Sequence, residues 1–548
     1  MSTNKSAIKV AIIGMGPRGL GALEALLNQC ALHNRTVNLS VFDPLDLGGA
    51  GPNFDPGQSI LGLLNTPTRD VQLDTELILA CGGFPEWQAG QDHNDIDRYA
   101  PRAELGSYLQ QRFQDVVTTF KAMLTLSDYH DCATAIRRDE TGWHVTSTAN
   151  EHGPFDEILL VPGQPQTEYD AQWASWVEHS RQSDADCIQA YPDQNVLDAA
   201  KGWTGRKVGI RGLGLSTFDV LRYLTAGQGG RFEKNVYHKS GKEPDRIFAF
   251  SLNGQPPFPK PENARQDQDY SLQRVEIEQF LLVLKNAVSL PHDQALDHIC
   301  DALVAPTFRI GSTMGMDGDV SDIRKWLQTE RTSPGDQETH APVDTLKQGI
   351  AMANGSVPPT IGYVIGQIWR KLQNELRIGF NSAQISPETA RALIDLDEGL
   401  KRYAYGPPLS SACAMLALID CGLVSLSVVD DPDVAMVDEG WQLFDDGEAA
   451  TVSVMINAVL APPSLQKITD PFVVQLRSQN FLHEFYEGSG AKTIPDGQVV
   501  TATGAVVKGL CLLGRLSLGS VIAVDSINDC FGASAQRWAA GVIRRSQP

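Results

Sequence analysis

Cysteine pairs, an excess of basic residues and long apolar runs are all missing from this chain of 548 residues. The nine cysteines are scattered and never spaced as CxxC, which disfavours a disulfide framework or a zinc site and favours reduced thiols. The 45 basic and 66 acidic residues give a net charge of −21. Because nucleic acid and anionic membranes both need a basic face, we expect neither as a partner.

Export, membrane and metal signals are missing as well. The first residues lead directly into a predicted strand, without a charged-then-apolar signal, which favours a cytoplasmic protein. No stretch reaches about 18 uninterrupted apolar residues, the length of a membrane span. His292 and His298 have no nearby partner set, so we expect them to be structural and predict no metal site. The length predicts two or three domains.

A strand, a glycine-rich turn and an apolar-periodic helix follow one another from residue 8. The strand IKVAII precedes Gly14, Gly16 and Gly19, which have the GxGxxG spacing. The first glycine permits a tight turn, the second lets a pyrophosphate approach the backbone, and the third lets helix and strand pack closely. Free N–H groups at the helix amino terminus favour phosphate. The segment predicts a nucleotide site rather than a purely structural turn.

The segment after this helix indicates which nucleotide is bound. A second strand, VNLSVFD, ends in Asp43, where an acid hydrogen-bonds a ribose hydroxyl. Gly48 and Gly49 follow, at a point where an NAD domain would normally continue into its next helix. FAD-binding enzymes with two dinucleotide domains have a glycine-rich loop here instead. We therefore predict FAD at the first turn.

A second unit of the same kind occurs at residues 206–225. It contains Gly212 and Gly214, but Thr217 stands at the third glycine position. Ser216 and Thr217 are suited to capping the helix or to bonding a phosphate. We interpret the unit as a site for NADPH or NADH. The alternative is a degenerate Rossmann-like unit that keeps the packing and binds nothing.

Basic residues follow the second turn, along a short strand that we predict from residue 235. Lys239 and Lys242 lie beyond this strand, where the 2′-phosphate of NADPH would be met. A solvated loop explains the same residues equally well. The preference for NADPH over NADH is therefore weak.

The remaining chain predicts a discontinuous FAD domain. A Pro-rich polar link near residue 260 leads into long helical patterns, and a late apolar strand ends at Gly514. Related flavoproteins usually have Gly-Asp at that point, whereas Arg515 follows Gly514 here. We expect Arg515 either to neutralise a cofactor phosphate or to face the substrate. The predicted segments are an FAD-binding domain (1–200), an NAD(P)-binding unit (201–260), a mostly helical substrate cap (261–400), the remaining NAD(P) or substrate region (401–485) and the FAD-domain return (486–548).

Several ordered motifs together resemble one family. They include GMGPRG (14–19), GGAGPNF (48–54), LLNTPTRDV (63–71), RYAPRAELGSYL (98–109), VPGQP (161–165), RGLGLSTFDVLRYLTAGQGGRF (211–232), YHKSGKEP (237–244) and YGPPLSSA (405–412). The chain resembles the bacterial FAD/NAD(P)-binding oxidoreductases, which are related to class B flavin monooxygenases and amino-acid N-hydroxylases. The resemblance implies an α/β fold of GR2 type, with two Rossmann-like dinucleotide-binding domains and a mostly helical insertion.

The resemblance also implies roles for individual residues. It implies that the first turn, including Pro17 and Arg18, binds FAD together with Asp43 and Gly163. It implies that Asn65 and Arg102 lie near the flavin. It assigns Gly212, Gly214 and Ser216 to the nicotinamide cofactor. Three positions depart from the family pattern: Thr217, Arg515, and Leu252, where relatives often have arginine.

The implied reaction is an NAD(P)H-dependent flavin monooxygenation. Reduced FAD would react with O₂ to a C4a-hydroperoxide that oxygenates a small substrate, an amine among the options. Asn65 and Ser216 are the candidate catalytic donors. One alternative is an FAD dehydrogenase or oxidase that acts directly on its substrate, with a degenerate second turn. Another is a non-catalytic, flavin-bound partner protein. The sequence specifies neither the substrate nor the oligomeric state.

Overall fold

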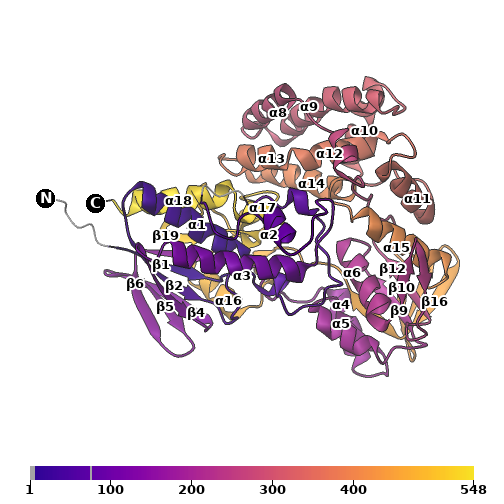
Figure 1. Ribbon diagram of the computed structural model, residues 1–548, viewed down its shortest axis with the longest axis horizontal. Helices are drawn as coiled ribbons and strands as arrows, with labels where there is room; N and C mark the ends of the chain where they lie inside the picture. Colours follow the sequence, from indigo (N-terminus) through magenta and orange to yellow (C-terminus); the bar gives the residue numbers. More distant parts are fainter. Residues whose placement is uncertain (1–6, 74–76, 548) are drawn as a thin grey trace.

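Two mainly parallel β-sheets and a block of helices organise the chain (Figure 1). The computed structural model describes residues 7–73 and 77–547. The first six residues, on which the prediction of a missing export signal partly rests, lie outside these ranges. Among the described helices, none is long and apolar enough to span a membrane.

The first sheet has six strands in the order β18-β19-β7-β1-β2-β3. Its strands are β1 (Ile8–Ile13), β2 (Val37–Phe42), β3 (Leu124–Tyr129), β7 (Glu157–Leu160), β18 (Gln498–Val500) and β19 (Val506–Leu512). All neighbours pair in parallel except β18 and β19. The late strand β19 thus completes a sheet that the first strand begins.

Both faces of this sheet are covered, which explains why its central strands are almost uniformly apolar. One face packs against α1 (Pro17–Leu32), α3 (Arg102–Thr119) and α18 (Ala533–Arg545), with α2 (Phe84–Gly90) and α17 (Ile527–Cys530) beside them. The other face packs against a three-stranded sheet and one helix. These elements are β4 (Ala133–Asp139), β5 (Gly142–Ser147), β6 (Glu151–Phe155) and α16 (Pro471–Ser478).

The second sheet has five parallel strands in the order β13-β12-β9-β17-β8. They are β8 (Asp186–Gln189), β9 (Lys207–Arg211), β12 (Arg246–Phe250), β13 (Val424–Ser425) and β17 (Val454–Asn457). The structure therefore places β8 in the second sheet, although it lies within the first predicted segment, 1–200. Elements packed around this sheet are α4 (Ala171–Ser180), α5 (Asp193–Ala200), α6 (Leu215–Leu224), α15 (Leu409–Asp420), β14 (Asp433–Val437), β15 (Gly440–Asp445) and β16 (Glu448–Val452).

The strand predicted from residue 235 does not join the second sheet. Strands β10 (Arg231–Glu233) and β11 (Val236–His238) form an antiparallel hairpin of their own. The parallel neighbour of β9 on that side is β12. The short strand predicted from residue 235 is therefore present as β11, but it is not the second strand of the parallel sheet, which resumes with β12 about eight residues later.

The helical insert leaves the second sheet after β12 and returns to it at α15. Figure 1 shows it as a block on one side of both sheet domains. Its apolar core draws on nearly every insert helix and on Ile522 of the C-terminal segment. The helices are α7 (Ala264–Gln268), α8 (Arg274–Ala287), α9 (His292–Thr313), α10 (Val320–Thr332), α11 (Pro342–Ala353), α12 (Ile361–Lys371), α13 (Gln373–Phe380) and α14 (Pro387–Ala404).

Candidate functional site

Both sheet domains and the insert border one cavity of about 1700 Å³. A typical small-molecule pocket has roughly 300–1,000 Å³, so this cavity has room for more than one ligand. It lies at the carboxyl ends of the parallel strands, where α/β sheets bind their ligands. The predicted residues that line it are Gly14, Gly16, Pro17, Arg18, Gly19, Asp43, Asn65, Arg102, Gly163, Gly212, Gly214, Ser216, Gly514 and Arg515.

The first glycine turn leaves the backbone open at the amino terminus of α1. Gly14 has φ +96°, and a Cβ there would fall onto the Val161 carbonyl oxygen. A Cβ on Gly19 would lie 2.6 Å from the Gly14 carbonyl oxygen. These two glycines are therefore required by the fold. At Gly16, an added Cβ would meet only the Gly51 Cα, at 3.7 Å. Pro17 begins the helix, where its missing N–H costs nothing.

Asp43 stands at the end of β2, next to this turn. Its carboxylate accepts hydrogen bonds from the Met15 backbone N–H at 2.7 Å and from the Leu45 N–H at 2.9 Å. The acid is thereby held at the cavity edge beside the glycines, in the position of a ribose-binding acid.

The glycine pair after Asp43 serves packing rather than the cavity surface. A Cβ on Gly48 would meet the Phe113 ring at 2.8 Å, and one on Gly49 would meet the Leu109 carbonyl oxygen at 2.6 Å. Neither glycine lines the cavity, so their prediction as direct cofactor contacts is not supported. Gly51, with φ +65°, does line it and lies against Gly16; the third glycine of GGAG was the signal for it.

The predicted basic residues of the FAD domain are tied to the C-terminal segment. The Arg18 guanidinium donates to the Val524 carbonyl at 2.9 Å and pairs with Asp529 at 2.8 Å. Gly514, with φ +99°, gives Arg18 room to pass. Arg515 lines the cavity but pairs with Asp525 at 2.7 Å, so its charge is already compensated.

The second glycine turn is built like the first, except at Thr217. Gly212 has φ +120°, and nothing lies within 4 Å of a Cβ on Gly214. The Thr217 side chain is 0% exposed, and its hydroxyl donates to the Gly212 carbonyl at 2.7 Å. The hydroxyl therefore replaces the close approach that Gly19 makes to the Gly14 carbonyl. Thr217 does not face the cavity, which corrects its prediction as a phosphate contact.

Lys239 and Lys242 lie at the wrong end of the second sheet for a cofactor phosphate. They precede β12, whose first residue pairs with the first residue of β9, whereas the glycine turn follows the last residue of β9. A five-residue strand separates the two ends by about 16 Å. Neither lysine lines the cavity, so their prediction as 2′-phosphate contacts is not supported. The segment after β12 that does line it begins Ser251-Leu252-Asn253.

Arg102 connects the two sheet domains within the cavity wall. It opens α3, and its guanidinium pairs with Asp219 of α6 at 2.7 Å and donates to the Tyr223 hydroxyl at 3.1 Å. Burial disfavours the charge of Arg102, but Asp219, together with Tyr191 and Tyr223, more than offsets this and raises the Arg102 pKa. The Tyr191 hydroxyl also donates to Asp219, at 2.8 Å. Sequence reasoning missed Asp219 and Tyr191, because nothing local marks them as partners of Arg102.

Asn65 brings the predicted flavin loop against the insert. Its backbone carbonyl accepts a hydrogen bond from Lys260, and its side chain lines the cavity. Lys260, Arg370 and Lys371 line the same wall. Sequence reasoning assigned no chemistry to the insert, so these cations were missed as well.

The residues present fit FAD at the first turn and a nicotinamide cofactor at the second. Each turn offers helix N–H groups with an unobstructed glycine at its second position, which is the geometry that accepts a pyrophosphate. An acid at the end of the second strand, where a ribose would be met, follows only the first turn: Asp43 comes after β2, whereas Ser251 comes after β12. The second turn is thus open for a ligand rather than closed by packing.

This fold is the one that defines the class of flavoproteins with two dinucleotide-binding domains. Residues 11–165 match the sequence model of a family described as FAD-NAD(P)-binding. The solved FAD-bound cadaverine monooxygenase of Erwinia amylovora has the same fold, with a TM-score of 0.50 and 11% identity over 99% of this chain and 94% of that one. The predicted fold class and the predicted cofactors, FAD and NAD(P), are confirmed.

Two curated relatives are similar over most of both chains. Nitrosuccinic acid synthase of Aspergillus oryzae is 25% identical over 85% of this chain and 80% of its own. An L-aspartate N-monooxygenase of Streptomyces davaonensis, described as nitrosuccinate-forming, is 24% identical over 90% of this chain and 88% of its own. The predicted resemblance to amino-acid N-hydroxylases is confirmed.

Proposed function

We propose that this protein is an FAD-dependent, NAD(P)H-dependent N-monooxygenase that oxygenates the amino group of a small amino acid, with L-aspartate as the first candidate. The observation that carries the proposal is the single cavity onto which both glycine turns and the insert open. The similarity to N-monooxygenases named for aspartate supports the choice of substrate. The need for reduced nicotinamide favours the cytoplasm as its location.

The reaction consumes one O₂ and one NAD(P)H and a proton for each oxygen transferred. The amine becomes a hydroxylamine, the second oxygen atom leaves as water, and NAD(P)H becomes NAD(P)⁺. Bound FAD supplies the electron storage and the oxygen chemistry, which no amino-acid side chain provides.

The chain's own residues bind, orient and shield the reactants. We propose that the first turn and Asp43 hold FAD, and that Gly212, Gly214 and the amino terminus of α6 hold the nicotinamide cofactor. The insert forms part of the cavity wall, and excluding water from the loaded cavity would strengthen each polar contact with the reactants. Asn65 and Ser216 remain our proposed donors beside the reacting atoms, since both line the cavity.

Cofactor reduction is the first test of this function. We expect the purified protein to show a flavin spectrum, and we expect NADPH or NADH to bleach it under anaerobic conditions. Air should then restore the oxidised spectrum. Retention of FAD with no bleaching by either nicotinamide would contradict the proposal and favour the direct dehydrogenase or oxidase.

A further inference from the structure

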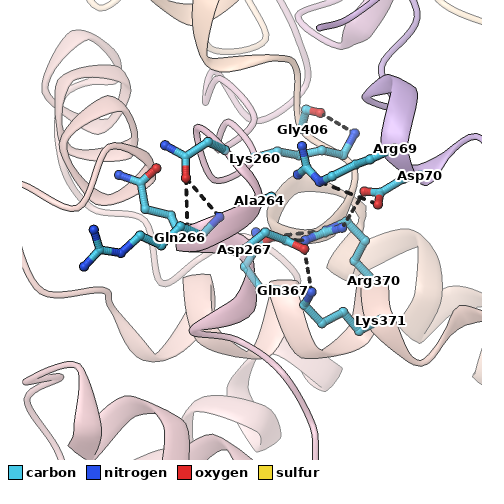
Figure 2. A network of polar contacts seen from close by, with 12 residues as sticks. Arg69, Asp70, Lys260, Ala264, Gln266, Asp267, Gln367, Arg370, Lys371 and Gly406 are labelled. Atoms are coloured by element: carbon cyan, nitrogen blue, oxygen red, sulfur yellow. Dashed lines mark hydrogen bonds and ion pairs between the residues drawn. The ribbon is translucent and has the colours of Figure 1, made fainter. Parts of the chain in front are cut away.

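Lys260 stands where three segments of the cavity wall meet. Its backbone N–H donates to the Pro407 carbonyl at 3.1 Å, which joins the links that leave and re-enter the second domain. Its ammonium donates to the Gly406 carbonyl at 3.1 Å and to the carbonyl of Asn65 in the FAD domain. Figure 2 shows the side chain reaching Gly406. The ammonium therefore lies next to the proposed flavin loop, on the insert side.

The charge of Lys260 has no carboxylate of its own. The residue is only 6% exposed, and both recorded acceptors of its ammonium are neutral carbonyls. Within the described ranges, no carboxylate comes within the 4.0 Å limit of an ion pair with it. A buried charge normally requires a partner of opposite sign. The side chain thus presents an uncompensated cation to the cavity.

The surrounding acids are already engaged by other cations. Asp267 of α7 pairs with Arg370 and, at 2.6 Å, with Lys371. Asp70 lies 4.0 Å from Arg370 and 3.7 Å from Arg69. Arg69 also pairs with Asp97. The three carboxylates Asp70, Asp97 and Asp267 are thus paired with the three cations Arg69, Arg370 and Lys371. Figure 2 shows Asp70 and Asp267 within this network. Lys260 is the fourth cation, and it has no carboxylate among these three.

We propose that Lys260 binds a carboxylate of the substrate and so determines that the amine substrate is an anionic amino acid. The proposal rests on the proposed function, since it assigns the substrate-binding part of the same site. The incoming carboxylate supplies the fourth negative charge of the network. It anchors the substrate between Asn65 of the proposed flavin loop and α12 of the insert.

The ionisation of Lys260 supports this assignment. Burial, and next the neighbouring Arg370, lower the pKa of Lys260 to about 7, while Asp70 and Asp267 oppose the shift. The free ammonium is therefore lost as the pH rises through about 7. A bound carboxylate favours the charged form and raises the pKa again. Carboxylate affinity should thus be full below that pH and fall above it.

A binding titration tests the proposal without turnover. Succinate, a dicarboxylate without an amine, is added to the oxidised FAD-loaded enzyme, and its Kd is read from the flavin absorbance. We expect Lys260→Met to raise this Kd about 10- to 100-fold, the usual effect of losing a charge-assisted hydrogen bond. Lys260→Arg should keep it within about fivefold. Lys401→Met is the matched control, because that cavity-lining ammonium already pairs with Glu398 at 2.6 Å.

The pH dependence of the wild-type enzyme gives a second, independent result. Succinate Kd should rise from about pH 6.5 to about pH 9, a range above the pKa of carboxylic acids, and Lys260→Gln should flatten the profile. This arm decides the question if Lys260→Met does not fold. A wild-type Kd that is constant with pH, or a Lys260→Met Kd equal to that of the wild type, would overturn the proposal. Failure to oxygenate any amine would instead overturn the proposed function and leave the succinate result intact.

Discussion

Replacing Thr217 with valine removes one hydroxyl from the second glycine turn and preserves the shape of the side chain. That hydroxyl is buried and donates to the Gly212 carbonyl at 2.7 Å. Depriving a buried carbonyl of a partner costs about 1–2 kcal/mol, which corresponds to about a 5- to 30-fold change in an equilibrium. The free turn then samples other conformations, and cofactor binding has to restore the open one. We expect the Kd of NADP⁺ or NAD⁺ to rise by about tenfold.

The assay is a titration of the oxidised enzyme with NADP⁺ and with NAD⁺, followed by flavin absorbance. Thr217→Ser keeps the hydroxyl and should bind almost as the wild type does. Thr225→Val is the matched control, because its buried hydroxyl donates to the Leu221 carbonyl at 2.6 Å at the far end of the same helix. It should lower stability without changing nicotinamide affinity. Equal affinities for Thr217→Val and wild type would refute the role given to the hydroxyl.

Three further predictions concern the cofactor turns and the contact between domains. Gly14→Ala should abolish FAD retention, measured by the flavin-to-protein absorbance ratio, because its Cβ falls onto a carbonyl oxygen; Gly205→Ala, with φ +77° but open space around it, should cost only about 1 kcal/mol of stability. Arg102→Met removes the closer of the two cations on buried Asp219 and leaves Arg222 at 3.1 Å. It should lower the free energy of unfolding by about 1–3 kcal/mol, measured by denaturant titration, and an unchanged free energy would contradict a stabilising contact between the two domains. Lys242→Ala should leave the ratio of NADPH to NADH affinity unchanged, and a loss of NADPH affinity alone would contradict the placement of this lysine.

The first domain could be predicted largely from the sequence, because its signals are local. The glycine spacing, the acid at the end of β2 and the apolar run of β19 each occupy a short segment with one obvious geometry. Gly14 and Gly19 are required by backbone contacts that any such strand–turn–helix unit makes. Gly48 and Gly49 look equally suited to a cofactor, yet the partners that exclude side chains there, on α3, are about 60 residues away.

The second domain was harder to predict because a hairpin interrupts its sheet. The turn of that hairpin lies at Lys234 and Asn235, with φ +46° and +65°. Asparagine tolerates this left-handed conformation, so Asn235 was the available hint. Apart from that hint, the sequence does not distinguish a three-residue strand of a hairpin from the next strand of a parallel sheet. Lys239 and Lys242 were therefore assigned to the wrong end of the second sheet.

The cation network of the insert has no sequence signature at all. Lys260 bonds to Asn65 and to the link at 406–407. The neighbouring ion pairs join Arg370 of α12 to Asp70 and to Asp267 of α7. These segments are brought together only by the packing of the insert against both sheet domains. From the sequence alone, a single lysine in a Pro-rich link is predicted to be solvent-exposed, and only the structure shows that Lys260 is buried.

The most direct test of the central proposal is oxygen labelling with L-aspartate. The enzyme is supplied with NADPH, ¹⁸O₂ and L-aspartate, and the product is analysed by mass spectrometry. We predict an aspartate oxygenated at nitrogen that carries ¹⁸O, formed in step with NADPH consumption. The proposed N-monooxygenase would be contradicted if NADPH consumption yielded only hydrogen peroxide and left L-aspartate, and the other amines tested as substrates, unchanged.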